Sequence, residues 1–105
     1  MIVNIEDKDL EELITIGENG TYKKYARDRK FMQNLISVIN VMKATERASD
    51  LKQFSFLHYE QLKGCRMSSV RVMNGRVERL IFKELNEGIE IMIMELNVTH
   101  YGNKK

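Results

Sequence analysis

The fold of this chain is decided by the stretch Met67-Ser68-Ser69-Val70-Arg71-Val72-Met73-Asn74-Gly75-Arg76-Val77-Glu78-Arg79-Leu80-Ile81-Phe82-Lys83. Apolar and polar side chains alternate over residues 67–73 and again over residues 76–83, and this period of two predicts two β-strands. The pair Asn74-Gly75 between them is a strong signal for a hairpin turn. The stretch therefore predicts two antiparallel strands joined by a tight turn.

The register of this hairpin decides which side chains share a face, because a shift of one residue moves each side chain to the other side of the sheet. We expect the large apolar residues of both strands to lie together in the core: Val70, Val72, Leu80 and Phe82. That register places Arg71 and Arg79 together on the outer face, and it needs a loop of odd length, such as residues 73–75. A two-residue Asn-Gly loop would instead place the two arginines on opposite faces.

Apolar residues before the hairpin recur at helical spacing. The strongest pattern predicts an amphipathic helix whose apolar stripe would lie against a sheet: Phe31, Leu35, Val38, Ile39 and Met42. We expect this helix to begin as early as Thr21 and to end near Lys43. A shorter helix is predicted over residues 9–16, and one further helical turn over residues 48–53.

Two other segments predict strands. Residues 2–5 form a short first strand in this prediction, and residues 89–96 form a last strand after a turn at Glu87-Gly88. The order is therefore a strand, helices, and then three strands joined by tight turns. Helices with one apolar stripe bury it by covering one face of a sheet. We therefore predict a single domain over residues 1–105, of the α+β class, with two layers and a mainly antiparallel sheet.

Composition and charge exclude several classes of protein. The chain has 105 residues and a net charge of only +2, but residues 63–83 hold six bases and one acid, whereas residues 1–20 hold six acids and one base. Cys65 is the only cysteine, so an internal disulfide is excluded and a cytoplasmic protein is expected. The acidic N-terminus does not resemble a signal peptide, and no apolar run approaches the roughly 20 residues that span a membrane.

Arg71 and Arg79 have two possible roles on the outer face. Guanidinium groups bind phosphate in a bidentate way, so the pair suits a phosphodiester. The alternative is an ordinary solvated sheet face on which the arginines form cross-strand pairs with acids: Glu78, Glu84 and Glu90. Two histidines and one cysteine without close spacing argue against a zinc site, and no glycine-rich phosphate loop is present. No metal or cofactor is therefore expected.

Four short segments in a fixed order resemble a known family. They are Leu62-Lys63-Gly64, Ser69-Val70-Arg71-Val72, Arg79-Leu80-Ile81-Phe82 and His100-Tyr101-Gly102. This order resembles the toxins of bacterial type II toxin–antitoxin modules, in the RelE/ParE superfamily and nearest the HigB type, over nearly the whole chain. The resemblance implies a RelE-like fold and a small ribonuclease that cuts messenger RNA in the ribosomal A site without a metal. It also implies a cognate antitoxin, which neutralises the toxin and through which the pair often binds its own operator DNA.

The resemblance also implies roles for individual residues, on the concave sheet face and at the C-terminal end. Cleavage proceeds by attack of the ribose 2′-OH on the adjacent phosphate, which needs a proton acceptor, a proton donor and cations around the phosphate. Arg71 and Arg79 would stabilise the phosphate, with Lys63 as a supporting cation. His100 would exchange a proton near neutral pH, and Tyr101 would stack on a base or take part in proton transfer.

The chain departs from the family pattern at two places. Many HigB-type sequences have a histidine three residues before the lysine of Leu-Lys-Gly, where this chain has Glu60, while His58 lies two residues earlier. Either Glu60 is the base, or the segment bulges and His58 reaches the site. Glu60 is also a plausible partner for Lys63. Acidic-aromatic pairs are common near the end of some members, whereas residues 97–101 read Asn-Val-Thr-His-Tyr, which leaves His100 itself as the proton-transfer group.

Two rival functions remain open at this point. One is a ParE-like poison of DNA gyrase, which needs no cluster that cleaves phosphate. The other is a non-catalytic domain that binds RNA or protein. The ribonuclease hypothesis requires Arg71, Arg79, Lys63 and either His100 or Tyr101 to converge on one face of the sheet.

Overall fold

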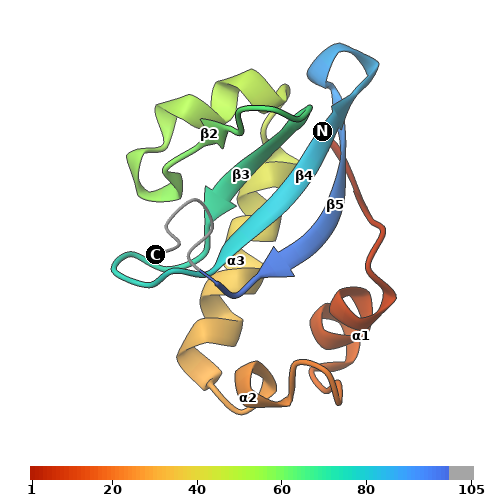
Figure 1. Ribbon diagram of the computed structural model, residues 1–105, viewed down its shortest axis with the longest axis vertical. Coiled ribbons are helices and arrows are strands. Elements are labelled where there is room, and N and C mark those ends of the chain that lie inside the picture. Colours follow the sequence, from red (N-terminus) through yellow and green to blue (C-terminus); the bar gives the residue numbers. More distant parts are fainter. Residues whose placement is uncertain (100–105) are drawn as a thin grey trace.

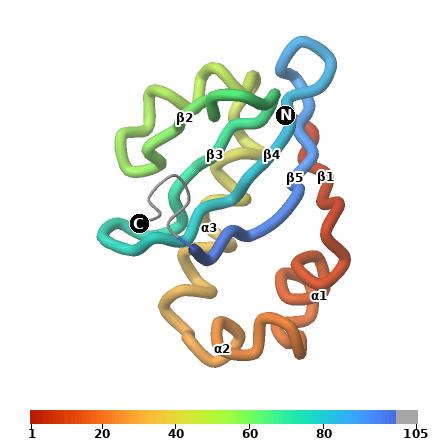
Figure 2. Tube along the Cα trace, in the orientation of Figure 1, coloured from red at the N-terminus to blue at the C-terminus, as the bar shows by residue number. Residues whose placement is uncertain are grey.

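A computed structural model describes residues 1–99 of the chain (Figures 1 and 2). The helices are α1 Lys8–Ile16, α2 Lys23–Ala26 and α3 Arg29–Ala44, and three short 3₁₀ turns are η1 Ala48–Gln53, η2 Ser55–Leu57 and η3 Asn86–Gly88. The strands are β1 Ile2–Ile5, β2 Glu60–Gln61, β3 Met67–Arg71, β4 Arg79–Leu85 and β5 Glu90–Asn97. The predicted order of one strand, helices and then a sheet is confirmed.

The five strands form one sheet in the order β1-β5-β4-β3-β2. β1 runs parallel to β5, and the other neighbours are antiparallel. Figure 1 shows α3 crossing behind the sheet, while no α-helix of the described residues lies over the face turned to the viewer. We call this second face the open face. The structure is therefore the predicted two-layer α+β domain with a mostly antiparallel sheet.

The apolar stripe of α3 fills the space between the two layers. All five predicted stripe residues are buried: Phe31, Leu35, Val38, Ile39 and Met42. The sheet contributes the four residues that the hairpin register predicted, Val70, Val72, Leu80 and Phe82, together with Ile91, Ile93 and Leu96 of β5. Burial of side chains of this size stabilises a fold by about 1.5–3 kcal/mol each. The sheet residues of this core cluster lie on the face that α3 covers, so this packing holds α3 on that face.

The segment from Thr21 to Ala44 is not one continuous helix. Asp28 has extended backbone angles (φ −93°, ψ 93°), and its side chain accepts a hydrogen bond from the backbone N–H of Phe31 at 3.0 Å. Asp28 therefore caps α3, as aspartate commonly does, and separates it from the single turn of α2. The prediction of a helix that begins as early as Thr21 is wrong for this reason, while its predicted end at Lys43 lies one residue before the observed end.

The hairpin between β3 and β4 has the register that places both arginines on one face. Arg71 pairs directly with Arg79, and Val70 pairs with Leu80. The loop is longer than the expected 73–75, because β3 ends at Arg71, β4 begins at Arg79, and the backbone N–H of Val72 still donates to the carbonyl of Glu78 at 3.3 Å. The five residues 73–77 between that bonded pair form a loop of odd length, as the shared face requires.

Two further features of the sheet were absent from the sequence prediction. β2 is a short edge strand in which Glu60 pairs with Ser69. The pairing of β4 with β5 shifts between Ile81 and Phe82, which leaves Met94 as an additional residue on β5.

Within residues 1–99, none of the helices has both the length and the apolar character needed to cross a membrane.

Candidate functional site

The two arginines lie side by side on the open face, at the end of the β3–β4 pair next to the connecting loop. Arg71 is the last residue of β3, Arg79 is the first residue of β4, and the two are a direct cross-strand pair. The Cβ atoms of such pairs lie about 4.5–5.5 Å apart, so two positive charges start from adjacent points of the sheet. Like charges placed directly opposite each other destabilise a sheet. The pair therefore creates a local positive field that favours an anion.

Within residues 1–99, three neighbouring segments hold Arg79 in place. Its Nε donates to Ser69 Oγ of β3 at 2.8 Å, and its terminal nitrogen donates to the backbone carbonyl of His58. The same terminal nitrogen lies 3.6 Å from Oε1 of Glu60 in β2. Arg79 is only 6% exposed. Its guanidinium is therefore oriented before any ligand arrives.

His58 and Glu60 both reach the surroundings of Arg79. His58 has left-handed backbone angles (φ 47°, ψ 49°) at the end of η2, and its carbonyl is the acceptor for Arg79. Its exposed ring places Nε2 3.3 Å from Oδ1 of Asn74 in the β3–β4 loop. Glu60 contacts Arg79 through its carboxylate, so Arg79 rather than Lys63 is its ion-pair partner. Of the two alternatives for the proton acceptor, the Glu60 carboxylate thus contacts Arg79, whereas the His58 ring contacts the β3–β4 loop.

Arg71 differs from Arg79 in its hydrogen bonds. Its Nε is buried, and among residues 1–99 it has no hydrogen-bond partner. Most buried polar groups in native proteins are hydrogen-bonded, and a buried donor without a partner costs free energy. Arg71 therefore has an unused donor beside the anchored guanidinium of Arg79.

The three acids proposed as ordinary partners bind other groups. Glu78 accepts from Arg76 and Tyr25, Glu84 accepts from Tyr59 and Ser68, and Glu90 accepts from Asn4 and Asn86. The simple solvated face with Glu78, Glu84 and Glu90 as cross-strand partners is therefore not the arrangement in this structure. Glu60 supplies the acid beside Arg79 instead.

Lys63 is not brought to the arginine pair. It is exposed in the turn between β2 and β3, next to the point where the backbone N–H of Leu62 donates to the carbonyl of Met67 at 2.9 Å. Met67 and Arg71 are the two ends of β3, which a strand of this length separates by about 13 Å. His100 and Tyr101 lie outside the described residues. The structure thus groups Arg71, Arg79, Glu60 and His58.

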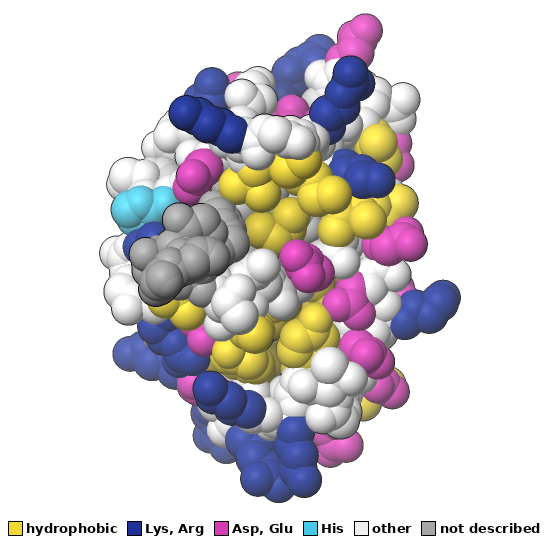
Figure 3. Space-filling model, in the orientation of Figure 1, with side chains coloured by type: hydrophobic (Ala, Val, Ile, Leu, Met, Phe, Trp, Pro, Cys, Tyr) yellow, Lys and Arg dark blue, Asp and Glu magenta, His cyan; other side chains and the backbone are white. Residues whose placement is uncertain are grey.

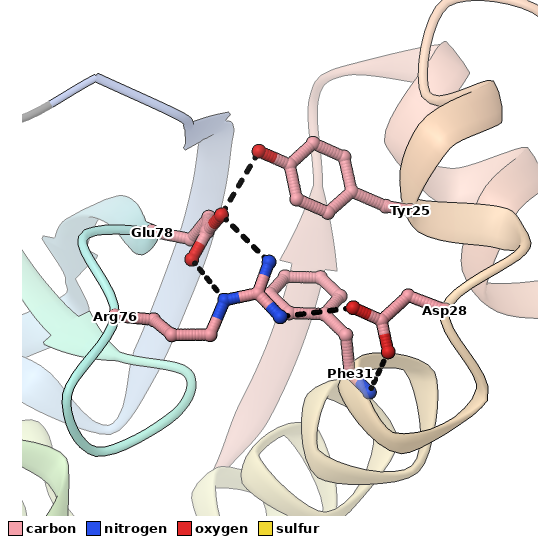
Figure 4. Close-up of polar contacts among 5 residues, drawn as sticks. All are labelled: Tyr25, Asp28, Phe31, Arg76 and Glu78. Atoms are coloured by element: carbon pink, nitrogen blue, oxygen red, sulfur yellow. Dashed lines mark hydrogen bonds and ion pairs between the residues drawn. The ribbon is translucent and has the colours of Figure 1, made fainter.

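A partly buried ionic network, in which Glu78 is buried and Arg76 and Asp28 are half-buried, supports the loop that leads to Arg79 (Figure 4). Arg76 donates through Nε and one terminal nitrogen to both oxygens of Glu78, at 3.1 and 3.0 Å, and through the other terminal nitrogen to Asp28 at 2.9 Å. The hydroxyl of Tyr25 donates to Glu78 at 3.0 Å, and the guanidinium lies over the ring of Phe31 with 5.1 Å to its centroid. The network ties the β3–β4 loop to α2 and α3.

The network was not predicted from the sequence, although Arg76 and Glu78 were counted among the charges of the segment. Its members lie in two distant parts of the chain, residues 25–31 and residues 76–78, and no spacing rule in the sequence connects them. The only sequence signal was Asp28 followed by a helical pattern, which is typical of an N-cap. The same side chain also binds Arg76, so the cap and the ionic network share one carboxylate.

The network changes the proton affinity of its members. Burial raises the pKa of Glu78, but the hydrogen bonds from Arg76, from its own backbone N–H and from Tyr25 outweigh this and leave the pKa below its ordinary value. Burial and the bond to Glu78 raise the pKa of Tyr25 to about 12. The hydrogen bonds from Arg76 and from the N–H of Phe31 lower the pKa of Asp28.

We expect the Glu78 carboxylate to make the stability of the protein depend on pH. A lowered pKa in the folded state contributes stability that is fully present above the ordinary value of 4.5 and is lost as the pH falls through the lower folded value. Glu78→Gln should therefore lower the free energy of unfolding most above about pH 5.5, and the difference from wild type should shrink in acid. Urea unfolding of both proteins across this range measures it. A difference that stays constant into strong acid would contradict the prediction.

Within residues 1–99 there is no group of three or more His, Cys, Asp and Glu side chains that could hold a metal ion. No model of a known protein family matches the sequence, and no curated protein matches it either.

Proposed function

We propose that the chain is the toxin of a type II toxin–antitoxin module, of the RelE/ParE superfamily and nearest the HigB type, and that it cleaves messenger RNA at the ribosome. The observation that carries this proposal is the direct pairing of Arg71 with Arg79 on the open face, with the Glu60 carboxylate 3.6 Å from Arg79. Two adjacent guanidinium groups beside a carboxylate supply cations for a phosphate and a candidate proton acceptor.

The proposed reaction is an internal transfer at one phosphodiester. The ribose 2′-oxygen attacks the adjacent phosphorus, the bond to the 5′-oxygen breaks, and the products are a 2′,3′-cyclic phosphate and a free 5′-hydroxyl. Glu60, whose carboxylate lies beside Arg79, or the His58 ring, which contacts Asn74 in the neighbouring loop, takes the proton from the 2′-hydroxyl. Arg79 and Arg71 stabilise the charge that grows on the phosphate oxygens. The proton for the leaving 5′-oxygen is assigned to His100 or Tyr101, as the family resemblance implies.

The proposal includes partners and a place of action. The substrate is messenger RNA in the ribosomal A site, in the cytoplasm. A cognate antitoxin neutralises the protein by binding it, and operator DNA is contacted through that antitoxin. The reaction requires no metal ion.

Messenger-RNA mapping after induction tests this function. We expect expression of the wild-type chain in a bacterial host to arrest growth and to generate new RNA ends that carry a 5′-hydroxyl within coding sequences. Lys43→Ala, which removes an exposed cation at the far end of α3, should leave both effects unchanged. Growth arrest with intact messenger RNA and inhibited DNA supercoiling would replace the proposal with a ParE-like gyrase poison.

A second candidate is a non-catalytic domain that binds RNA or protein. The observation in its favour is the 6% exposure of Arg79, whose guanidinium makes bonds within the protein. This candidate predicts no growth arrest and no new RNA ends from a stably expressed, folded chain. The mapping experiment therefore separates all three functions.

A further inference from the structure

A second basic surface lies away from the arginine pair, over α2 and the first turn of α3. Its five cations are all exposed, and we call them together the α2–α3 basic surface: Lys23, Lys24, Arg27, Arg29 and Lys30. Figure 3 shows Lys and Arg side chains gathered at the lower end of the view, where Figure 1 places α2. None of the five forms an ion pair within residues 1–99, and the only ring contact is that of Lys24 with its neighbour Tyr25.

The acid nearest in sequence does not neutralise this surface. Asp28 is the only acid in residues 21–30, and both of its oxygens are occupied. One accepts from the backbone N–H of Phe31 and the other from Arg76 of the β3–β4 loop. The positive field of the five cations is therefore not cancelled from within the segment.

The placement of two of these cations opposes the stability of α3. Arg29 and Lys30 occupy the first turn, which holds no acid, although the N-terminus of a helix carries partial positive charge and favours acids. The cation at the other end, Lys43 in the last turn, has the favourable placement. Helix stability therefore does not explain the charge of this first turn.

The surface lacks the apolar anchors of a protein-binding site. Stable protein interfaces have an apolar core with a polar rim, and their binding energy concentrates in large side chains. The exposed large apolar residues of the described chain include none between Ile16 and Ile36. Nucleic-acid backbones, by contrast, are bound mainly through lysine and arginine contacts to phosphate.

We propose that the α2–α3 basic surface binds the phosphate backbone of double-helical RNA and positions the protein on its target. The choice of RNA rests on the proposed ribonuclease function. The surface is connected to the candidate site, because Tyr25 of α2 bonds Glu78, which directly precedes Arg79.

The neighbouring groove limits where the duplex lies. A groove of about 670 Å³ separates the end of α1 from α2, with Lys23 and Arg27 on one side and Glu12 and Glu18 in the same lining. Carboxylates repel phosphates, so the backbone follows the α3 side of α2 and stays away from α1.

Removing the first-turn cations tests the proposal. We expect Arg29→Gln with Lys30→Gln to bind a fluorescent RNA hairpin duplex about 10-fold more weakly than wild type, and to lower the slope of log affinity against log salt by about two. Its melting temperature should not fall, because the removed charges oppose the helix dipole. The control is Lys8→Gln with Lys43→Gln, which also removes two exposed charges and should keep the wild-type affinity.

Equal affinity and equal salt slope for the two double variants would overturn the proposal. So would an effect of the first-turn variant on poly-glutamate or on a DNA duplex with none on the RNA duplex, because the occupant would then be an acidic protein or DNA. The measurement is separate from cleavage, since duplex binding is scored by fluorescence anisotropy. Duplex binding without messenger-RNA cleavage would remove the ribonuclease function and leave the surface in place. Cleavage by the wild type, together with unchanged duplex binding by the first-turn variant, would remove the proposed role of the α2–α3 basic surface and leave the ribonuclease function in place.

Discussion

Arg76→Ala should lower the free energy of unfolding by about 3 kcal/mol, because it leaves a buried carboxylate without its main partner. Glu78 is only 5% exposed, and Arg76 donates to both of its oxygens. Without the guanidinium, Glu78 keeps the Tyr25 hydroxyl but loses both charged donors. For a domain of this size, the change corresponds to a fall in melting temperature of roughly 15 °C.

The shape of guanidinium explains why no other side chain should replace Arg76. Its three nitrogens bind Glu78 twice and Asp28 once, and its flat face lies over Phe31 (Figure 4). Lysine has a single charged nitrogen and no flat face, so it cannot make these contacts together. Arg76→Lys should therefore recover only a small part of the lost stability.

Chemical denaturation followed by circular dichroism measures these changes. The matched control is Arg66→Ala, because Arg66 is exposed in the turn before β3 and has no partner within residues 1–99. Arg76→Ala combined with Glu78→Gln should cost less than Arg76→Ala alone, since the buried charge is then removed with its partner. Equal unfolding midpoints for Arg76→Ala and Arg66→Ala would show that the network does not hold the loop.

The sequence carried most of the information about the layers of the fold. The spacing of the α3 stripe predicts a helix against a sheet, and the size of Leu80 and Phe82 predicts the register of the hairpin. Both follow from local periodicity and from the burial of large apolar side chains. The loop length was not predictable in this way. Arg76 and Glu78 bind Asp28 and Tyr25, which lie about 50 residues earlier, and no local pattern reports such a distant pairing.

The candidate site was predictable only in part, for a similar reason. Arg71 and Arg79 follow from the register, which is a local property. The approach of His58 and Glu60 depends on the left-handed backbone of His58, where a non-glycine residue is uncommon and sequence gives little warning. The position of Lys63 depends on the short strand β2, which pairs only two residues with β3 and has no alternating pattern of its own.

Arg71→Ala should reduce the rate of messenger-RNA cleavage by about 100-fold, the lower end of the effect of removing one hydrogen-bond donor from a developing anion. It should do so without lowering the stability of the fold. The substitution removes a buried Nε that has no hydrogen-bond partner within residues 1–99, and it also removes the positive charge directly opposite Arg79. The first change removes the free-energy cost of an unpaired buried donor, and the second removes the repulsion between the two arginines. The melting temperature should therefore stay the same or rise.

Lys83→Ala is the matched control, because Lys83 is an exposed cation on β4 that faces Met67 at the other end of the same hairpin. Cleavage of a reporter messenger RNA in a ribosome-containing translation extract gives the rates, and thermal unfolding gives the stabilities. Arg79→Ala is less informative, since Arg79 is buried and its loss would disturb Ser69 and the His58 carbonyl. Lower activity combined with equal or higher stability identifies a residue that serves function at the expense of folding. Cleavage by Arg71→Ala at the rate of Lys83→Ala would show that the open face holds no phosphate clamp.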